Sequence, residues 1–369
     1  MPFAAACTTR RAGYRGYAFV ANEEGQAVAA VDLQALAVAR HISLDSAPVD
    51  VQGPRTMKAA REFPFVFALT PDNGSIQAIQ ADRLSFARKL AVGSQAISMH
   101  LSRDDRAIYV LTREPKAVVR VAIDRFQIDW KLALPDDPHD FAISPDGKKA
   151  AVSGGEAVRL IDLDARRVGP PLGSPADIGA VRFLSDSKRM IAANRSDRQL
   201  SLYDVDSARL IVHLPIAVRP DNLCFNLSLE GNADGGQLFV TGEGLDGVVI
   251  VYPYHIPEVG LTVLAGHAPG AMAASESYLF VAGPQSGDVS ILSIATQKVI
   301  AVLPVGNDPG FVAVTPDDQY ALVLNRKSGD IAVLRVDLIT PNRYKEKAAK
   351  LLTVIPVGSK PVSAAIRSV

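Results

Sequence analysis

Residues 138–147 read Pro138-His139-Asp140-Phe141-Ala142-Ile143-Ser144-Pro145-Asp146-Gly147. A second copy of this pattern reads Pro309-Gly310-Phe311-Val312-Ala313-Val314-Thr315-Pro316-Asp317-Asp318. Each copy is a short apolar run that ends in Ser or Thr followed by Pro-Asp, a combination that favours a tight turn. Related segments recur along the whole chain. The sequence is therefore built from repeats, and a repeat of this kind buries its faces only against its neighbours.

The period of the repeat is set by the turn residue that ends one apolar strand in every copy. We call these eight positions the anchor residues: Asn22, Thr70, Thr112, Gly154, Asn194, Gly242, Gly283 and Asn325. Successive anchors are 48, 42, 42, 40, 48, 41 and 42 residues apart. An alternating apolar and polar run follows each anchor, as in residues 75–81, which is the pattern of a half-buried strand. A short run of small apolar residues, as in residues 362–366, suits an innermost strand.

These features predict an all-β chain that forms a single β-propeller of eight four-stranded blades. Seven blades is the alternative if the unit of Gly154 or Gly242 is absorbed elsewhere. The chain begins on a second strand (Tyr17–Asn22) and ends on an innermost strand (Pro361–Ser368). The C-terminal strand is therefore expected to complete the N-terminal blade, because an open ring would expose two sheet edges. We expect residues 1–15 to be a tail, residues 16–369 the propeller, and residues 342–350 a helical turn.

The composition excludes several classes of protein. The chain has 369 residues, 48% of them hydrophobic, and 39 basic side chains balance 39 acidic ones. A neutral chain lacks the clustered positive charge that nucleic-acid binding requires. No apolar run approaches the roughly 18 residues that span a bilayer. We therefore expect a monomer that has no nucleic-acid partner and no membrane span.

The two cysteines suggest no disulfide framework. Cys224 lies in an apolar strand and is expected to be a buried thiol. No Cys-x-x-Cys-His segment and no pair of metal-type cysteines occurs, so neither a metal nor a cofactor is predicted. The stretch Ala4-Ala5-Ala6-Cys7 resembles the end of a bacterial lipoprotein signal. Cys7 is the candidate lipidation site, which implies a periplasmic or cell-surface location; the alternative is a frayed tail with a chance cysteine.

The repeat resembles the YVTN-type β-propeller family, which overlaps in pattern with lactonase-type, surface-layer and secreted bacterial propellers. The resemblance rests on Ile143-Ser144-Pro145-Asp146-Gly147, on the strand ends Phe19-Val20-Ala21-Asn22 and Val323-Leu324-Asn325, and on the closing pairs Val305-Gly306 and Val357-Gly358. It covers about 350 residues and implies the propeller fold. The matching residues belong to turns and packing, so no catalytic residue is carried over from the family.

Ligands of propellers usually bind around the mouth of the central channel. Loops that lead into innermost strands, and loops between second and third strands, share that face. Their polar residues supply the candidate ligand-binding residues: His139, His267, Arg219, Asp221, Asn307 and Arg195. Asp146, Asp186 and Asp317 belong to turns on the opposite face and are expected to stabilise those turns.

The two candidate histidines have structural alternatives. A neutral imidazole at a channel mouth would bind a metal or act as a base, whereas the alternative role of His139 is to cap its loop. His267 is expected at the equivalent position four blades away, across the axis, too far for the pair to share one metal ion. His100, on an inner strand, is expected to be packed or to line the channel.

Arg219-Pro220-Asp221-Asn222 is the densest polar loop of the face, with Arg195 to Arg198 expected nearby. An arginine flanked by carboxylates would hold an anionic small molecule. The alternative is a rim ion pair that contributes little to stability.

Two functions compete. The first is a non-enzymatic propeller outside the cytoplasm that binds a protein, peptide or glycan on its channel-mouth face. The second is a lactonase-like hydrolase or isomerase that acts on a small anionic ligand over the channel. Because the sequence contains no nucleophile motif and one fold hosts many functions, binding is the preferred prediction. A redox propeller holding quinone or haem is disfavoured, since no attachment motif is present.

Overall fold

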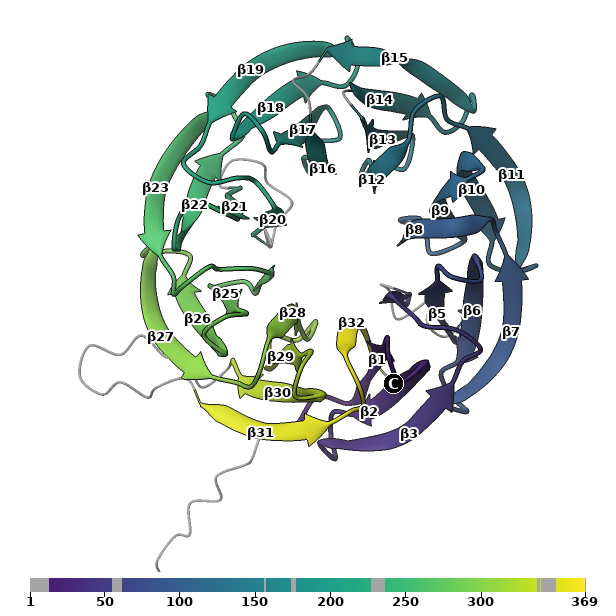
Figure 1. The fold of residues 1–369 in the computed structure, drawn as a ribbon, viewed down its shortest axis with the longest axis vertical. Coiled ribbons are helices and arrows are strands. Elements are labelled where there is room, and N and C mark those ends of the chain that lie inside the picture. Colours follow the sequence, from purple (N-terminus) through teal and green to yellow (C-terminus); the bar gives the residue numbers. More distant parts are fainter. Residues whose placement is uncertain are drawn as a thin grey trace, which may run out of the picture.

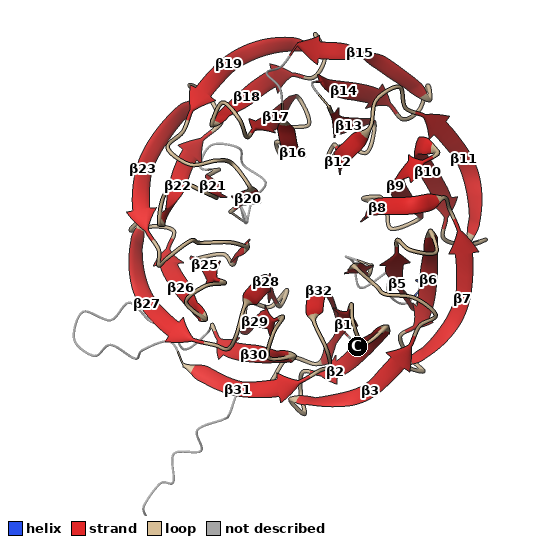
Figure 2. Ribbon diagram, in the orientation of Figure 1, coloured by secondary structure: helices blue, strands red, loops and turns tan. Residues whose placement is uncertain are grey.

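The computed structural model describes residues 13–54, 62–155, 157–173, 177–226, 236–336, 339 and 350–368. Within these residues, strands β1 to β32 form eight four-stranded antiparallel sheets. The sheets surround a central axis, and within each sheet the four strands follow one another from the channel outward to the rim (Figure 1). Figure 2 shows that strands and connecting loops make up the ring. The predicted all-β propeller with eight blades is confirmed, and the units of Gly154 and Gly242 each form a blade of their own.

We number the blades along the chain. Blade 1 contains β32 and β1–β3, blade 2 β4–β7, blade 3 β8–β11, blade 4 β12–β15, blade 5 β16–β19, blade 6 β20–β23, blade 7 β24–β27 and blade 8 β28–β31. The innermost strands are β4 (Asp50–Gln52), β8 (Ser94–Leu101), β12 (Pro138–Ile143), β16 (Ile178–Phe183), β20 (Asn222–Phe225), β24 (Met272–Ala274), β28 (Pro309–Val314) and β32 (Pro361–Ser368). The second strands are β1 (Gly16–Asn22), β5 (Phe65–Thr70), β9 (Ala107–Glu114), β13 (Lys149–Gly154), β17 (Arg189–Asn194), β21 (Leu238–Thr241), β25 (Tyr278–Gly283) and β29 (Tyr320–Asn325).

The third strands are β2 (Ala27–Asp32), β6 (Ser75–Gln80), β10 (Lys116–Ala122), β14 (Ala157–Asp162), β18 (Gln199–Asp204), β22 (Gly247–Tyr252), β26 (Asp288–Ser293) and β30 (Asp330–Arg335). The outermost strands are β3 (Ala37–Ser43), β7 (Ser85–Ala91), β11 (Gln127–Ala133), β15 (Arg167–Gly173), β19 (Arg209–Pro215), β23 (Glu258–Leu264), β27 (Lys298–Pro304) and β31 (Leu351–Pro356).

The C-terminal strand closes the ring, as predicted. β32 pairs antiparallel with β1 from Gly16 opposite Ser368 to Asn22 opposite Pro361. Tyr14, which is buried, forms a 2.7 Å hydrogen bond with Ser368 through its hydroxyl group. Blade 1 is therefore assembled from both ends of the chain, and its innermost edge is covered by the last strand of the sequence.

The core lies between neighbouring blades. The second strands are almost continuously apolar and buried, as in Phe65–Thr70, because each blade face is covered by the next blade. The outermost strands instead alternate in exposure, as in Lys298–Pro304. Between blades 3 and 4 the fully buried Phe141 contacts His100, with ring centroids 5.5 Å apart, and Tyr109, with centroids 6.4 Å apart. His100 is thus packed against an aromatic ring.

The Pro-Asp turns lie between innermost and second strands, on the face opposite the channel mouth. Asp146 accepts hydrogen bonds from the Ser144 hydroxyl at 2.6 Å and from the Lys148 N–H at 3.1 Å. Asp317 is bonded in the same way by the Thr315 hydroxyl at 2.7 Å and the Gln319 N–H at 3.1 Å. The carboxylate of each turn thus holds its own backbone, as the sequence predicts.

Three predictions fall partly or wholly outside the described residues: the tail up to residue 12, the lipidation site Cys7, and the helical turn over residues 342–349. Among the residues that are described, no helix is long and apolar enough to cross a membrane.

Candidate ligand-binding face

The channel-mouth face is formed by two sets of loops, because all blades have the same strand order. One set leads from the outermost strand of a blade into the innermost strand of the next, and the other joins second to third strands. The predicted residues Arg195, Arg219, Asp221, His267 and Asn307 lie in these loops. His139 is the second residue of β12 and lies at the same end of its blade.

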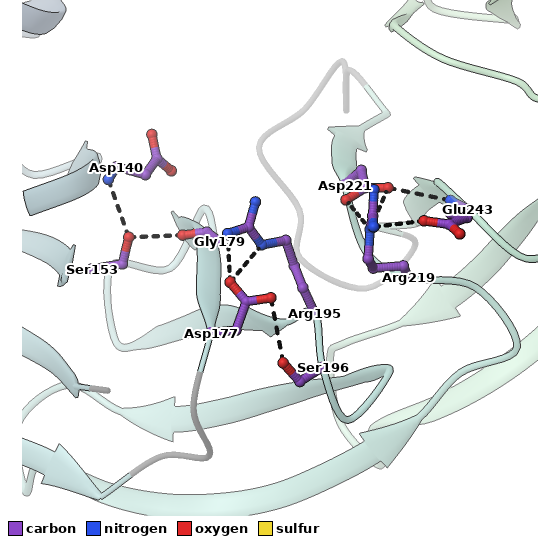
Figure 3. Close-up of polar contacts among 9 residues, drawn as sticks. All are labelled: Asp140, Ser153, Asp177, Gly179, Arg195, Ser196, Arg219, Asp221 and Glu243. Carbon is purple, nitrogen blue, oxygen red and sulfur yellow. Dashed lines mark hydrogen bonds and ion pairs between the residues drawn. The ribbon is translucent and has the colours of Figure 1, made fainter. Parts of the chain in front are cut away.

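Blade 5 carries an ion pair between the two sets of loops. Asp177, which precedes β16, accepts hydrogen bonds from Arg195, which follows β17, at 3.1 Å (Nε) and 2.5 Å (Nη2). The Arg195 backbone N–H donates to the Asp177 carbonyl oxygen at 3.0 Å. Gly179 leaves space for the arginine, since a Cβ there would lie 3.1 Å from Arg195 Cδ. Figure 3 shows the pair, with Ser196 donating to the second carboxylate oxygen.

The same unit recurs in blade 8. Arg326 follows β29 and donates through Nη2 to Asp308, which precedes β28, at 3.0 Å. Its backbone N–H donates to the Asp308 carbonyl oxygen at 2.9 Å. Arg326 also lies against Gly310, as Arg195 lies against Gly179. Asp177 and Asp308 both have a left-handed backbone, with φ of 60° and 57°. The sequence also places Asp177, Asp308 and Arg326 in the rim loops, but they were not among the six candidate ligand-binding residues, and their pairing was not predicted. The shared 18-residue separation of Asp and Arg is visible in the sequence.

In blades 6 and 1 the charges are exchanged, so that the basic residue lies ahead of the innermost strand and the acidic residue follows the second strand. Arg219, ahead of β20, bonds Glu243, after β21, at 2.6 Å and also contacts Asp221 at 2.8 Å (Figure 3). The hydrogen bond to Asp221 raises the pKa of the Arg219 guanidinium. In blade 1, Lys360 contacts Glu23 at 3.0 Å, and the Glu23 N–H donates to the Lys360 carbonyl oxygen. The structure thus places charge pairs between the same two sets of loops in blades 5, 6, 8 and 1, although Arg219 lies three residues ahead of β20 while its counterparts directly precede their strands.

The predicted proximity of Arg195 and Arg219 is confirmed. Both pairs appear in one close-up of adjacent blades (Figure 3), and Asp177 contributes to the electrostatic environment of Arg219. Arg198 reaches the next blade, where its Nη1 lies 2.9 Å from the position that a Cβ of Gly244 would take. On the other side, Ser153 of blade 4 donates to the Gly179 carbonyl oxygen at 2.7 Å.

The predicted relationship between the two histidines is wrong. His139 belongs to blade 4 and His267 to the loop before blade 7, so they are three blades apart and not at equivalent positions. His139 is part of an innermost strand, whereas His267 lies in the loop five residues ahead of β24. His139 is exposed and interacts electrostatically with Asp137. The structure does not bring the two imidazoles together.

His267 is held by Asp246. Its Nδ1 lies 3.1 Å from both carboxylate oxygens of Asp246, which also accepts the Ala268 N–H at 2.9 Å. The hydrogen bond and the charge of Asp246 raise the pKa of the His267 imidazole. Asn307, the remaining candidate, is fixed through its backbone: its N–H donates to the Ser328 hydroxyl at 3.2 Å and its carbonyl oxygen accepts the Lys327 N–H.

Two grooves lie among the charged loops of the channel-mouth face. The blade 6–7 groove has a volume of about 720 Å³ and is lined by Arg219, Asp221, Glu243, Asp246, Leu264 and His267, among others. The blade 8–1 groove has a volume of about 650 Å³ and is lined by Glu24, Asp308, Arg326, Lys327 and Lys360, among others. Carboxylates outnumber cations in the first groove and cations outnumber carboxylates in the second.

Cys224 was predicted to be a buried thiol, but it is only partly buried on the innermost strand β20. Burial raises the pKa of its thiol to about 12, so the side chain is protonated at neutral pH and is a poor nucleophile. Within the described part of the chain, no cluster of three or more His, Cys, Asp or Glu side chains has the geometry to hold a metal ion.

No protein-family model and no curated protein matches the chain. Solved structures do resemble it. The dihydro-heme d1 dehydrogenase NirN aligns with a TM-score of 0.71 at 12% identity, covering 99% of this chain and 77% of that one. Apo AztD from Citrobacter koseri aligns with a TM-score of 0.70 at 13% identity, covering 96% of this chain and 98% of that one. Hydrazine synthase of Kuenenia stuttgartiensis aligns with a TM-score of 0.59 at 19% identity, covering 78% and 95%. At these identities the likeness establishes a β-propeller and nothing more specific.

Proposed function

We propose that the protein is a binding protein that holds a protein, peptide or glycan ligand on its channel-mouth face and carries out no reaction on it. The observation that supports this function is the set of four charge pairs: Asp177–Arg195, Arg219–Glu243, Asp308–Arg326 and Lys360–Glu23. They join the same two sets of loops around one end of the channel, and residues of three of the pairs line two grooves.

Each pair presents hydrogen-bonding groups that are already oriented. Arg195 has five N–H donors, of which Nε and Nη2 bond Asp177, so the guanidinium retains donors for carbonyl or hydroxyl groups of a ligand. A side chain that is fixed before binding loses less conformational entropy when the ligand arrives. Because 36% of the Arg195 side chain and 39% of the Asp177 side chain are exposed, the pair contributes little to folding stability.

We also infer that the repeat is of the YVTN type. The inference is supported by the buried anchor residues Asn22 and Asn325. Their side-chain amides donate to the carbonyl oxygens of Val357 at 2.7 Å and Val305 at 2.9 Å. Each anchor thereby ties the end of a second strand to the loop after an outermost strand. Asparagine suits this position because its amide satisfies a buried carbonyl group.

A location outside the cytoplasm, with a lipid anchor on Cys7, is the second part of the proposal. Its support is the sequence Ala4-Ala5-Ala6-Cys7. Intact mass spectrometry of the protein from the membrane fraction of its host tests this location. A diacylglyceryl-cysteine mass at Cys7 is the expected result, and an unmodified chain recovered only from the cytoplasm would contradict it.

Replacing the rim arginines Arg195, Arg219 and Arg326 together with alanine is expected to weaken ligand binding by more than about tenfold, because hydrogen bonds to charged groups are lost. The thermal midpoint should change little, because exposed ion pairs contribute little. Binding is measured by screening the full chain on peptide and glycan arrays and then titrating the strongest ligands.

The matched control is Arg189→Ala, which removes an arginine paired with Asp186 on the opposite face. It should leave binding unchanged. Equal loss in the control and the triple variant would place the ligand elsewhere. Hydrolysis of a lactone panel that disappears with His139→Ala or Arg219→Ala would support the enzymatic alternative instead.

A further inference from the structure

The outermost strands form the lateral surface of the ring (Figure 1). Among the described residues, twelve large apolar side chains are exposed to solvent, and eleven of them belong to blades 5 to 8. Two lie on β19, three on β23, two on β27 and three on β31, and Ile256 lies in the turn between β22 and β23. The exposed apolar side chains are therefore concentrated on one half of the lateral surface.

Blades 1 to 4 have a different lateral surface. Their outermost strands each carry an exposed basic side chain, which in chain order is Arg40, Lys89, Lys131 or Arg167. Charged side chains on exposed strands oppose the association of two chains. Strand β23 lacks this protection over most of its length, because its one charged residue is Glu258, at the first position.

The exposure is greatest in blade 6, where Ile256, Leu261 and Leu264 are 83%, 62% and 70% exposed. Strand β23 contacts β27 of blade 7, which exposes Ile300 and Val302. We call these five residues, together with Val259 of β23, the lateral patch. Leu264, the last residue of β23, also borders the blade 6–7 groove. The lateral patch thus extends over two adjoining blades.

The area of the lateral patch matches that of a dimer interface. Its six side chains expose on the order of 600 Å², which is at the upper limit for one apolar patch on a monomeric protein. A standard interface buries about 800 Å² on each partner, and about 65% of a homodimer interface is apolar. One lateral patch therefore supplies the apolar area that one copy contributes to such an interface.

The composition of the lateral patch favours a second copy of the chain over other partners. Interfaces of transient complexes are about as apolar as the rest of a protein surface, whereas homodimer interfaces are more apolar. Strands β23 and β27 together contain one acidic and one basic residue, Glu258 and Lys298. They therefore lack the excess of positive charge that attracts a protein to anionic lipids.

We propose that the chain forms a two-fold symmetric dimer through the lateral patch, with β23 of the two copies packed antiparallel and Leu261 on the two-fold axis. Leu261 is the middle residue of the seven-residue strand, so this arrangement brings the two copies of β23 together along their whole length. The two Glu258 carboxylates then lie at opposite ends of the contact and do not repel each other. The dimer goes beyond the proposed function and departs from the monomer that the sequence predicts.

Sedimentation velocity of the full chain tests the dimer. The wild type is expected to be a dimer at micromolar concentration. Leu261→Lys should raise the dissociation constant at least about hundredfold, because two ammonium groups would meet at the axis. The variant should still unfold cooperatively, since Leu261 is exposed. Phe86→Lys is the matched control: it places the same charge on the outermost strand of blade 2 and should leave the dimer intact.

Cross-linking tests the position of the axis. A residue on a two-fold axis lies opposite its own copy. Leu261→Cys, made in a chain that also carries Cys7→Ser, should therefore be joined to its copy by a short bis-maleimide. Val354→Cys, on β31 of blade 8, is similarly exposed and should not be joined.

Three results would overturn the proposal. The first is a wild-type chain that remains a monomer at about 100 μM, where a dimer of ordinary stability is populated. The second is a dimer that Leu261→Lys does not weaken, which would place the interface elsewhere. The third is a monomer that binds neutral lipid vesicles and loses that binding with Leu261→Lys, which would assign the lateral patch to a lipid surface.

Discussion

Removal of β32, by ending the chain at residue 358, is expected to abolish cooperative folding. The deletion exposes the inner edge of β1 and removes a paired strand whose residues alternate between buried and partly buried. It also uncovers the fully buried Phe19 and Val20 of blade 1. A domain is held folded by only about 5–15 kcal/mol, and the loss of one strand from a closed ring exceeds that margin. Thermal unfolding followed by circular dichroism, together with size-exclusion chromatography, measures the effect.

A circular permutant separates ring closure from mere shortening. Gly16 and Ser368 lie opposite each other at one end of the β1–β32 pair. A two-residue turn would therefore join β32 to β1 as an ordinary hairpin, with the new chain beginning at residue 359 and ending at residue 358. This permutant is expected to fold. A truncated chain that remains monomeric and unfolds cooperatively near the wild-type midpoint would contradict the role given to β32.

Phe141→Ala is expected to lower the free energy of unfolding by about 3–5 kcal/mol, the usual cost of emptying a buried phenylalanine site. Phe141 is 0% exposed and packs against His100 and Tyr109 at the boundary of blades 3 and 4. These contacts join two blades, so the surrounding strands cannot collapse freely into the cavity. Urea denaturation of the variant and the wild type measures the difference.

Phe86→Ala is the matched control, because Phe86 lies on an outermost strand with 46% of its surface exposed. Its substitution should change the free energy of unfolding by about 0.5 kcal/mol. A loss of less than about 1 kcal/mol for Phe141→Ala would mean that the blades are not coupled through this aromatic contact.

The fold could be predicted from the sequence because its determinants are local and repeated. Asp146 and Asp317 stabilise turns through groups two residues away, and such contacts follow directly from the order of residues. The anchors Asn22 and Asn325 mark the ends of second strands. The phase of the repeat, from Tyr17 at the start to Ser368 at the end, then determined which strand closes the ring.

The side-chain contacts on the channel-mouth face were predicted less completely than the fold, because they depend on which loops the closed ring brings together. Arg195, Arg219, Asp177 and Glu243 were all expected on the rim, yet which of them pair became evident only from the structure. The number of blades between His139 and His267 depends on assigning every intervening strand to its blade, and the unequal lengths of the connections obscure that assignment in the sequence.

The pairing of β32 with β1 also determines which face of the propeller points away from a surface to which either end of the chain is attached. Gly16 and Ser368 pair at the beginning of β1, whereas Asn22, at the other end of that strand, leads into the loop of Glu23 on the channel-mouth face. Both ends of the ring therefore leave blade 1 on the side away from the grooves. A propeller tethered through either end, to a membrane or to a sensor chip, would present its grooves outward to the surrounding solution.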